Sequence, residues 1–189
     1  MDRRIRKSQR AIESALIELM KQKDFGEITI NSIAEKADVS RGTIYLNYED
    51  KYHILEKCIN EELNKLMESC MPNENDNNNL NLQTLLLRSL EYIAANSYVF
   101  ITLLENIGVQ TFRDKLLSMV RDSMFAQLNL TGINKDMNRE IFIQFWSVAI
   151  IGIIEWWVKN SMPYSSEEIT EHLFNLLSRN EVISSINDI

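Results

Sequence analysis

The chain has 189 residues, of which 45% are apolar, and it contains only five Gly and two Pro. A chain of this length can bury a core without disulfides or a structural metal, which excludes collagen-like, wholly disordered and small disulfide-rich proteins, and the shortage of turn residues favours a helical fold. The net charge of -7 is uneven, because residues 1–59 carry 11 Lys and Arg against 10 Asp and Glu, while the remaining residues carry 9 against 17.

The first residues are basic rather than apolar. Five basic side chains lie within residues 3–10 with only Asp2 opposing them. This density suits phosphate groups, although a solvated helix start has the same pattern. The segment lacks the apolar core of a signal peptide, and Cys58 and Cys70 form no metal-type pair. We therefore expect a reduced, cytoplasmic protein.

Apolar side chains at helical spacing predict an all-α chain. The first amphipathic helix is expected over residues 8–23, and later helices over 51–70, 80–95, 98–107, 110–129, 136–160 and 166–180. The Asn-rich run from Pro72 to Asn79 is too polar to be buried, so we expect a loop there. The sequence has no period-two strand pattern and no internal repeat.

Residues 28–48 contain two short helical patterns separated by about three residues, which is the spacing of a helix-turn-helix. Thr29 is placed to cap the first helix, and Ser40 to cap the second. The second helix opens with Arg41-Gly-Thr43, which carries little bulk. Its N-terminal end could therefore enter the major groove of DNA.

At these residues the sequence resembles the TetR family of bacterial transcriptional regulators, over roughly residues 5–60. The residues that carry the resemblance begin with an aromatic in the loop, Phe25, and a capping residue, Thr29, followed by the pair Ile33 and Ala34. They continue with Val39 and Ser40, a small residue with Thr (Gly42 and Thr43), two aromatics (Tyr45 and Tyr48), and a Lys that opens the next helix, Lys51. Three positions depart from the pattern. Asp38 stands where the family usually has Gly, in a left-handed position that Asp tolerates, and Asn47 and Tyr48 replace the commoner His and Phe.

The resemblance implies a helix-turn-helix DNA-binding domain over residues 1–50 and an effector-binding and dimerisation domain over residues 51–189. Side chains at the start of the second helix are then expected to contact bases: Arg41, Thr43 and Tyr45. Others are expected to contact phosphates: Arg6, Thr29, Asn47 and Lys51. Tyr48 is expected in the core. Any one of these residues could be an ordinary capping or surface residue, but their joint spacing favours DNA binding.

Residues 141–158 are apolar around nearly the whole helix, a length that would also suit a membrane span. Glu155 and the lack of interfacial flanks favour a helix covered by protein, so we expect no membrane partner. The next helix opens with a capping box, Ser165 to Glu168, and carries a leucine stripe. Because one chain cannot cover both helices, we expect a homodimer interface at Gly152, Trp156, Ile169, Leu173 and Leu176. The family resemblance implies the same two helices.

The expected function is a DNA-binding transcriptional regulator, a homodimer on a double-stranded operator, acting as a repressor that a small-molecule effector releases. Residues 152–173 also resemble a Firmicutes subset of the family that includes activators of dihydroxyacetone utilisation. One alternative is therefore a DNA-bound activator or adaptor with a protein effector. Another is a helical enzyme or lipid-handling protein, which the helix-turn-helix residues disfavour.

Catalytic and metal sites have little support in the sequence. His53 and His172 are far apart in the chain and belong to no paired-His motif. We expect no enzyme activity, metal or cofactor. Apolar residues between 80 and 160 could line an effector cavity or form closed core equally well, so no effector-binding residues are assigned.

Overall fold

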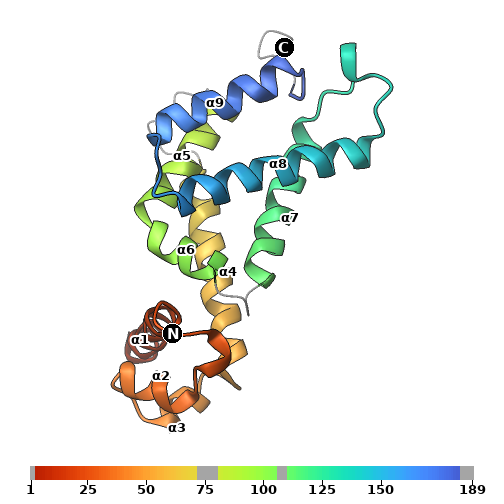
Figure 1. The fold of residues 1–189 in the computed structure, drawn as a ribbon. Helices are drawn as coiled ribbons and strands as arrows, with labels where there is room; N and C mark the ends of the chain where they lie inside the picture. The colour runs from red at the N-terminus through yellow and green to blue at the C-terminus, as the bar shows by residue number, and fades with distance from the viewer. Residues whose placement is uncertain (1–2, 72–80, 106–109, 184–189) are drawn as a thin grey trace. The chain divides into compact units, whose positions relative to one another are not determined.

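The computed structural model describes residues 3–71, 81–105 and 110–183 (Figure 1). The predicted Asn-rich loop lies outside these ranges. The described residues form helices joined by turns and loops, with a single isolated β-bridge between Leu128 and Ile183, which confirms the all-α fold. Contacts group the chain into unit 1, Met1–Lys65 with Tyr98–Phe112, and unit 2, Leu66–Ser97 with Arg113–Ile189. The division expected after residue 50 is one of function and stays a prediction.

Unit 1 contains α1 (Arg3–Met20), the short 3-10 turn η1 (Phe25–Glu27), α2 (Ile30–Lys36), α3 (Arg41–Tyr45), most of α4 (Lys51–Ser69) and nearly all of α6 (Ser97–Glu105). Helix α1 begins and ends earlier than the expected range of 8–23. Arg and Lys are good helix formers, so the basic segment extends the helix toward the N-terminus. The amides of Gln22 and Lys23 both donate to the Leu19 carbonyl, which closes the helix there.

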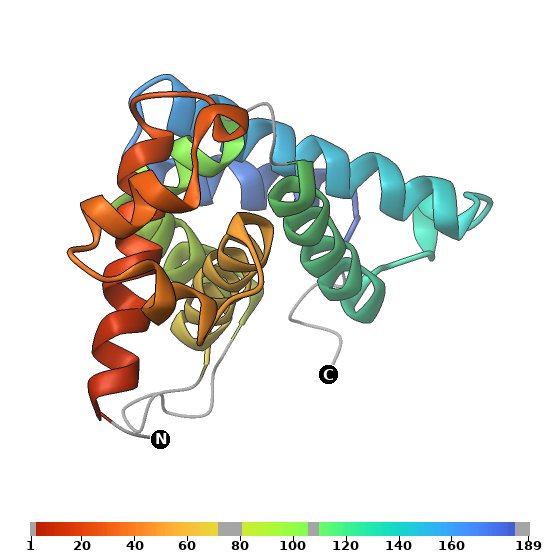
Figure 2. The same cartoon turned by 90° about the horizontal axis from the view of Figure 1, so that it is seen from below.

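The helix-turn-helix follows from local capping. Thr29 accepts a hydrogen bond from the Ser32 amide at 3.1 Å, and Ser40 accepts one from the Thr43 amide at 3.1 Å. Asp38 has a φ of 52°, the left-handed conformation that lets the chain turn between α2 and α3. Helix α2 packs on both α1 and α3, and Figure 2 shows the three helices side by side. The predicted caps and the left-handed residue are confirmed.

The core of unit 1 joins apolar side chains from every helix of the unit, among them Ile12, Leu16, Ile33, Ile44, Ile54, Ile59, Phe100 and Phe112. Tyr48 lies among them with 3% of its surface exposed, which confirms its predicted place in the core. A buried tyrosine hydroxyl needs a hydrogen-bond partner, and the partner it finds is described below.

Unit 2 contains α5 (Leu82–Ala95), α7 (Gln110–Gln127), the 3-10 turn η2 (Gly132–Asn134), α8 (Arg139–Lys159) and α9 (Ser166–Arg179). Apart from α1, the long helices agree with the predicted ranges to within three residues. Helix α9 packs on α5, and it opens with the predicted capping box between Ser165 and Glu168. The indole of Trp157 donates to the Tyr164 carbonyl at 2.8 Å and so fixes the turn from α8 into α9.

Helix α8 is long and apolar enough, with a mean hydropathy of 1.8, to cross a membrane by length and composition. The core helix of a globular protein meets the same criterion. One side of α8 is buried in unit 2, and Glu155 on this helix accepts a hydrogen bond of 2.7 Å from the Arg113 guanidinium of α7. This pairing is typical of a helix packed against protein.

Candidate nucleic-acid interface

Helix α3 exposes the side chains predicted to read bases. Arg41 and Tyr45 are exposed, and the Arg41 guanidinium lies 5.9 Å from the centre of the Tyr45 ring. Thr43 is partly exposed, and its hydroxyl lies 3.0 Å from that of Ser40. One short helix therefore presents a guanidinium, a hydroxyl and a phenol, which are groups that can bond to base edges.

Three of the predicted phosphate contacts lie in different settings. Arg6 is exposed on α1. Thr29 is exposed and uses its hydroxyl oxygen to cap α2. Asn47 is half-buried: its amide donates to the Thr43 carbonyl at 2.8 Å and accepts from Gln9 of α1 at 3.4 Å. Asn47 therefore ties the end of α3 to α1, and one N–H of its amide is already used.

Lys51, the fourth predicted phosphate contact, has a set of partners within unit 1. Its ammonium donates to the carbonyls of Phe25, Gly26 and Ile28 at 2.9, 3.0 and 2.8 Å. A lysine ammonium has three N–H donors, and these contacts use all of them. The ammonium also lies 4.8 Å from the centre of the Phe25 ring. This geometry competes with a phosphate contact, because it holds the loop that leads into α2.

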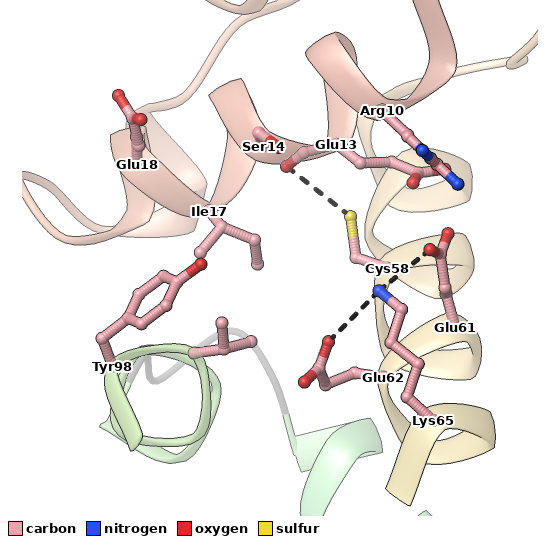
Figure 3. Close-up of a pocket in the computed structure, with 11 residues that line it drawn as sticks. Arg10, Glu13, Ser14, Ile17, Glu18, Cys58, Glu61, Glu62, Lys65 and Tyr98 are labelled. Carbon is pink, nitrogen blue, oxygen red and sulfur yellow. Dashed lines mark hydrogen bonds and ion pairs between the residues drawn. The ribbon is translucent and has the colours of Figure 1, made fainter. Parts of the chain in front are cut away.

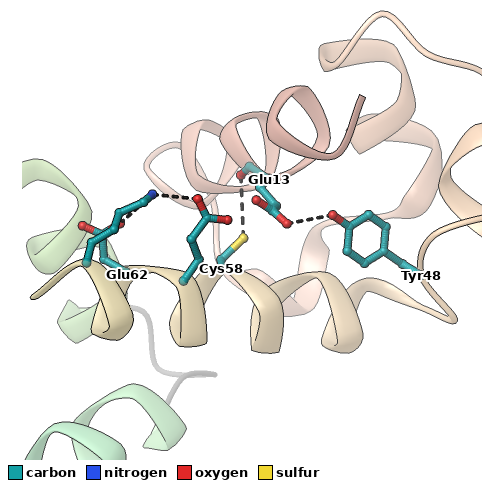
Figure 4. A network of polar contacts seen from close by, with 6 residues as sticks. Glu13, Tyr48, Cys58 and Glu62 are labelled. Atoms are coloured by element: carbon teal, nitrogen blue, oxygen red, sulfur yellow. Dashed lines mark hydrogen bonds and ion pairs between the residues drawn. The ribbon is translucent and has the colours of Figure 1, made fainter. Parts of the chain in front are cut away.

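A polar network behind α3 was not anticipated from the sequence. The hydroxyl of Tyr48 donates to the Glu13 carboxyl of α1 at 2.7 Å, and the thiol of Cys58 lies 3.9 Å from the Glu13 carbonyl (Figure 4). The Glu61 carboxyl of α4 lines the same cavity as Glu13 and interacts with its carboxyl. Lys65, one turn further along α4, pairs with Glu61 at 2.9 Å. The network thus joins α1, α4 and the residue that follows α3.

Burial and the charge of Glu61 change the acidity of this network. Burial raises the pKa of Glu13 to about 7, and the neighbouring Glu61 adds to that rise, although the hydrogen bond from Tyr48 opposes it. The hydrogen bond with Lys65 lowers the pKa of Glu61. Burial also raises the pKa of the Tyr48 hydroxyl and of the Cys58 thiol, so both stay protonated at neutral pH. Glu13 therefore gains and loses its proton near neutral pH.

The same groups border a cavity of about 370 Å³ within unit 1 (Figure 3). Its lining includes Arg10 and Glu13 of α1, Glu61 and Lys65 of α4, and Tyr98 of α6. Water can therefore reach the carboxyl pair and exchange protons with it. Among the described residues, no group of three or more His, Cys, Asp or Glu is arranged to hold a metal ion.

The residues predicted for a dimer interface divide into two sets. Trp156 and Leu176 are 47% and 45% exposed, and a side-chain carbon added at Gly152 would meet nothing within 4 Å. Ile169 and Leu173 are only 4% and 2% exposed, so they already pack inside the chain. Since α9 packs on α5, its leucine stripe serves the core of unit 2, and the exposed stripe lies on α8.

Apolar side chains that could have lined an effector cavity are divided between the units. Phe100 and Leu103 are buried in unit 1. Phe125 and Trp146 belong to unit 2, where Phe125 is exposed and the Arg139 guanidinium lies 3.9 Å from its ring centre. Phe125 lines a cavity of about 960 Å³ and Trp146 lines a second one of about 590 Å³. These side chains do not share one cavity, so the effector-binding residues stay unassigned.

Two family profiles match the chain. The profile described as "Bacterial regulatory proteins, tetR family" matches residues 12–58, and the one described as "Transcriptional regulator C-terminal region" matches residues 80–179. The chain belongs to the TetR family of transcriptional regulators. The first match covers the helix-turn-helix and the start of α4, and the second runs to the end of α9. The predicted family is confirmed.

Individual relatives agree with this assignment. The HTH-type transcriptional regulator YxbF of Bacillus subtilis (strain 168) is 29% identical over 174 residues, which are 89% of this chain and 44% of that protein. The chain thus spans less than half the length of this curated relative. A TetR transcriptional regulator from Streptococcus agalactiae 2603V superposes with a TM-score of 0.73 at 21% identity, over 93% of this chain and 96% of that one.

A second solved structure with this fold is the dihydroxyacetone kinase operon activator DhaS. It superposes with a TM-score of 0.64 at 18% identity, over 94% of this chain and 98% of that one. At such identities the likeness establishes the fold of the TetR regulator but not its ligand or its operator.

Proposed function

We propose that this TetR-family regulator binds a specific double-stranded operator as a homodimer in the cytoplasm, with Arg41, Thr43 and Tyr45 contacting bases. The observation that carries the proposal is the exposure of these three side chains on a capped helix of a helix-turn-helix. A short exposed helix of this kind fits the major groove, and the guanidinium of Arg41 suits the paired acceptors of guanine.

Phosphate contacts would fix the orientation of α3 on the duplex. We keep Arg6, Thr29 and Asn47 in that role, with the other basic side chains of α1 contributing to the local positive charge. Lys51 is assigned instead to holding the loop before α2, because three backbone carbonyls occupy its ammonium.

A two-fold-related operator needs two helix-turn-helix domains, here called reading heads, and therefore a dimer. We place the interface on the exposed stripe of α8, with Gly152 and Trp156 at its centre, and on Leu176 of α9. Phe145 extends the stripe and is 63% exposed. Ile169 and Leu173 support α9 from within the chain rather than contacting the partner. Burying this apolar stripe against a second copy would remove a large hydrophobic surface from water.

A small-molecule effector bound in the region 51–189 would then release a repressor by favouring one spacing of the two heads. Residues 1–50 keep the reading role in this scheme. Activation is the second candidate, because the chain shares its fold with DhaS, which is described as an operon activator.

Selection of bound duplexes from random DNA tests the proposal. We expect the wild-type protein to enrich one two-fold-related sequence, with half-sites separated by about one helical turn or a small multiple of it. The Arg41→Ala variant should enrich a degenerate version of that sequence. Lys57→Ala, which removes an exposed positive charge from α4, should enrich the original. Enrichment of no sequence by the wild-type protein would rule out the proposed function.

A further inference from the structure

We propose that Glu13 is a positioning residue for the DNA-reading helix: its carboxyl holds Tyr48, and the proton it shares with Glu61 decides how firmly α3 is held. This inference rests on the proposed function and extends it to a dependence of operator binding on pH. Glu13 contacts Tyr48 directly, and through Tyr48 it acts on the corner that follows α3.

The geometry forms a chain of polar contacts across unit 1. Tyr48 follows α3 after two residues and donates to Glu13 at 2.7 Å. Glu13 and Glu61 line the same cavity, and Glu61 pairs with Lys65 at 2.9 Å. Figure 4 shows Glu13 of α1 between Tyr48 and α4. The chain of contacts therefore runs from the corner after α3 through α1 to α4.

Two carboxyl groups can share a hydrogen bond only when one of them carries a proton. With Glu13 protonated, its carbonyl oxygen accepts from Tyr48 and its hydroxyl donates to the Glu61 carboxylate, which Lys65 neutralises. When Glu13 releases that proton to water, two carboxylates face each other and repel. Because burial raises the pKa of Glu13 to about 7, the exchange occurs near neutral pH.

Other charged and titratable groups surround this pair and have to be considered. Arg10 of α1 and Glu62 of α4 line the same cavity, and Glu62 lies 3.8 Å from Lys65. The lining also includes Ser14 and Glu18 of α1, the Cys58 thiol of α4 and the Tyr98 phenol of α6. On the far side of Tyr48, the ring of His53 lies 5.7 Å away in an edge-on arrangement. The test therefore needs variants that change Glu13 or Tyr48 and leave His53 in place.

The contacts of Tyr48 and Asn47 connect the protonation of Glu13 to the position of α3. The buried ring of Tyr48 and the amide of Asn47 anchor the end of α3 to α1. Ionised Glu13 accepts more strongly from Tyr48, but the raised pKa of Glu13 means that burial and repulsion by Glu61 outweigh this gain. The repulsion would loosen α1, which carries the anchor, against α4. A less firmly held α3 binds DNA more weakly, since its ordering must then occur on binding. Operator affinity should therefore fall as pH rises.

The experiment measures the dissociation constant of the full chain for the duplex recovered by selection, from pH 6 to pH 8 at constant ionic strength. The wild-type protein should bind about threefold to tenfold more weakly at pH 8 than at pH 6, the change expected when DNA binding shifts one pKa by half a unit to one unit. Glu13→Gln keeps an acceptor for Tyr48 and a donor for Glu61. It should bind with nearly constant affinity, close to that of the wild type at pH 6.

Two further variants identify the cause. Glu56→Gln removes one negative charge from an exposed position on α4, so it should keep the wild-type pH profile with a uniform change in affinity. Tyr48→Phe removes the hydroxyl but leaves the carboxyl pair intact. Its free energy of unfolding should still depend on pH, while its operator affinity should lose the dependence attributed to Glu13.

The outcomes are distinct. Binding of no duplex by the wild type at any pH would reject the proposed function. Normal binding with parallel pH profiles for wild type and Glu13→Gln would reject only the positioning role of Glu13. A wild-type profile in Tyr48→Phe would show that Tyr48 does not transmit the effect, and this too would overturn the inference.

Discussion

The Tyr48 hydroxyl donates a hydrogen bond of 2.7 Å to the Glu13 carboxyl, although the two residues lie 35 positions apart in the chain. A phenylalanine at position 48 would fill the same apolar space without needing a partner. The tyrosine makes the acidity of a residue on α1 relevant to the corner that follows α3.

The stability of the chain should decrease between about pH 5 and pH 7 because of Glu13. In the unfolded chain Glu13 titrates near 4.5, whereas folding raises its pKa to about 7, so the folded state holds a proton that the unfolded state has released. The stability that Glu13 contributes is fully present below its pKa in the unfolded chain. It is lost as pH rises through its pKa in the folded chain. Glu13→Gln should remove the decrease, as measured by urea unfolding at several pH values.

Urea unfolding of the same two proteins at acid pH provides a control for the effect of Glu13. Glu61 has a lowered pKa because of Lys65, so its contribution is present above its unfolded pKa and is lost as pH falls through the folded one. Wild type and Glu13→Gln should therefore lose stability alike below about pH 4, where carboxylates of this kind titrate. Curves that run parallel from pH 5 to pH 7 would contradict the raised pKa of Glu13.

Replacing Lys51 with Ala should destabilise unit 1 rather than remove a phosphate contact. The substitution leaves the carbonyls of Phe25, Gly26 and Ile28 without their donor, at a cost of about 1–3 kcal/mol. Lys57→Ala, an exposed lysine on the same helix, is the matched control and should cost little. Thermal unfolding of both variants compares the two.

Salt dependence of operator binding distinguishes the roles of Lys51. A residue that neutralises one phosphate contributes about -0.9 to the slope of log affinity against log salt. We expect Lys51→Ala to keep the wild-type slope while losing stability. A slope flatter by that amount, with unchanged stability, would restore Lys51 to the phosphate contacts.

Arg41 and Thr43 should govern sequence preference. Substituting either with Ala should cost about 1–3 kcal/mol on the selected operator and relax the preference at particular base pairs. Competition between the operator and single-base variants measures this effect. Thr43 also packs its hydroxyl against Ser40, so Thr43→Ser, which retains the hydroxyl, should keep most of the preference. Uniform weakening on all sequences would place both side chains on the backbone.

Gly152→Glu should separate the dimer without harming the fold of one chain. A side-chain carbon at this position meets nothing within 4 Å in the chain itself, so the chain has room for the start of the new side chain and the cost is expected from the partner. An unpaired charge buried in the interface costs about several kcal/mol. Each ~1.4 kcal/mol weakens the dimer about tenfold. Sedimentation at micromolar concentration measures it. Ser118→Glu, on the exposed face of α7, should remain dimeric.

Asp38→Gly should stabilise the protein. Asp38 has a φ of 52°, where a side chain meets the backbone unfavourably and Gly does not. The gain should be about 0.5–1 kcal/mol after the greater flexibility of Gly in the unfolded chain is deducted. Chemical unfolding gives the value. A loss of stability would mean that the aspartate side chain contributes an interaction of its own.

Features set by neighbouring residues could be predicted from the sequence. The caps at Thr29, Ser40 and Ser165 depend on residues three positions away, and the left-handed turn depends on Asp38 alone. The long helices were predictable because their apolar spacing extends over many residues. The three residues expected to contact bases lie on α3, and their contacts remain predictions.

Features that depend on how helices cross could not be predicted in the same way. The contacts of Lys51 could not be foreseen, because the carbonyls that accept from its ammonium lie 23 to 26 positions earlier in the chain. The pairing of Glu13 with Glu61 requires the packing of α1 on α4. The leucine stripe of α9 has the same spacing whether it faces its own chain or a partner, and only the contact with α5 shows that Ile169 and Leu173 face inward.

The contacts of Lys51 also bear on how such regulators can be recombined. The Lys51 ammonium holds the segment before α2. A fragment that stops at residue 50 would lack this lysine, and the backbone carbonyls of residues 25, 26 and 28 would lose its hydrogen bonds. A chimaera that borrows this reading head should therefore be joined beyond Lys65, so that the donor chain supplies the lysine, the carboxyl pair and the recognition helix together.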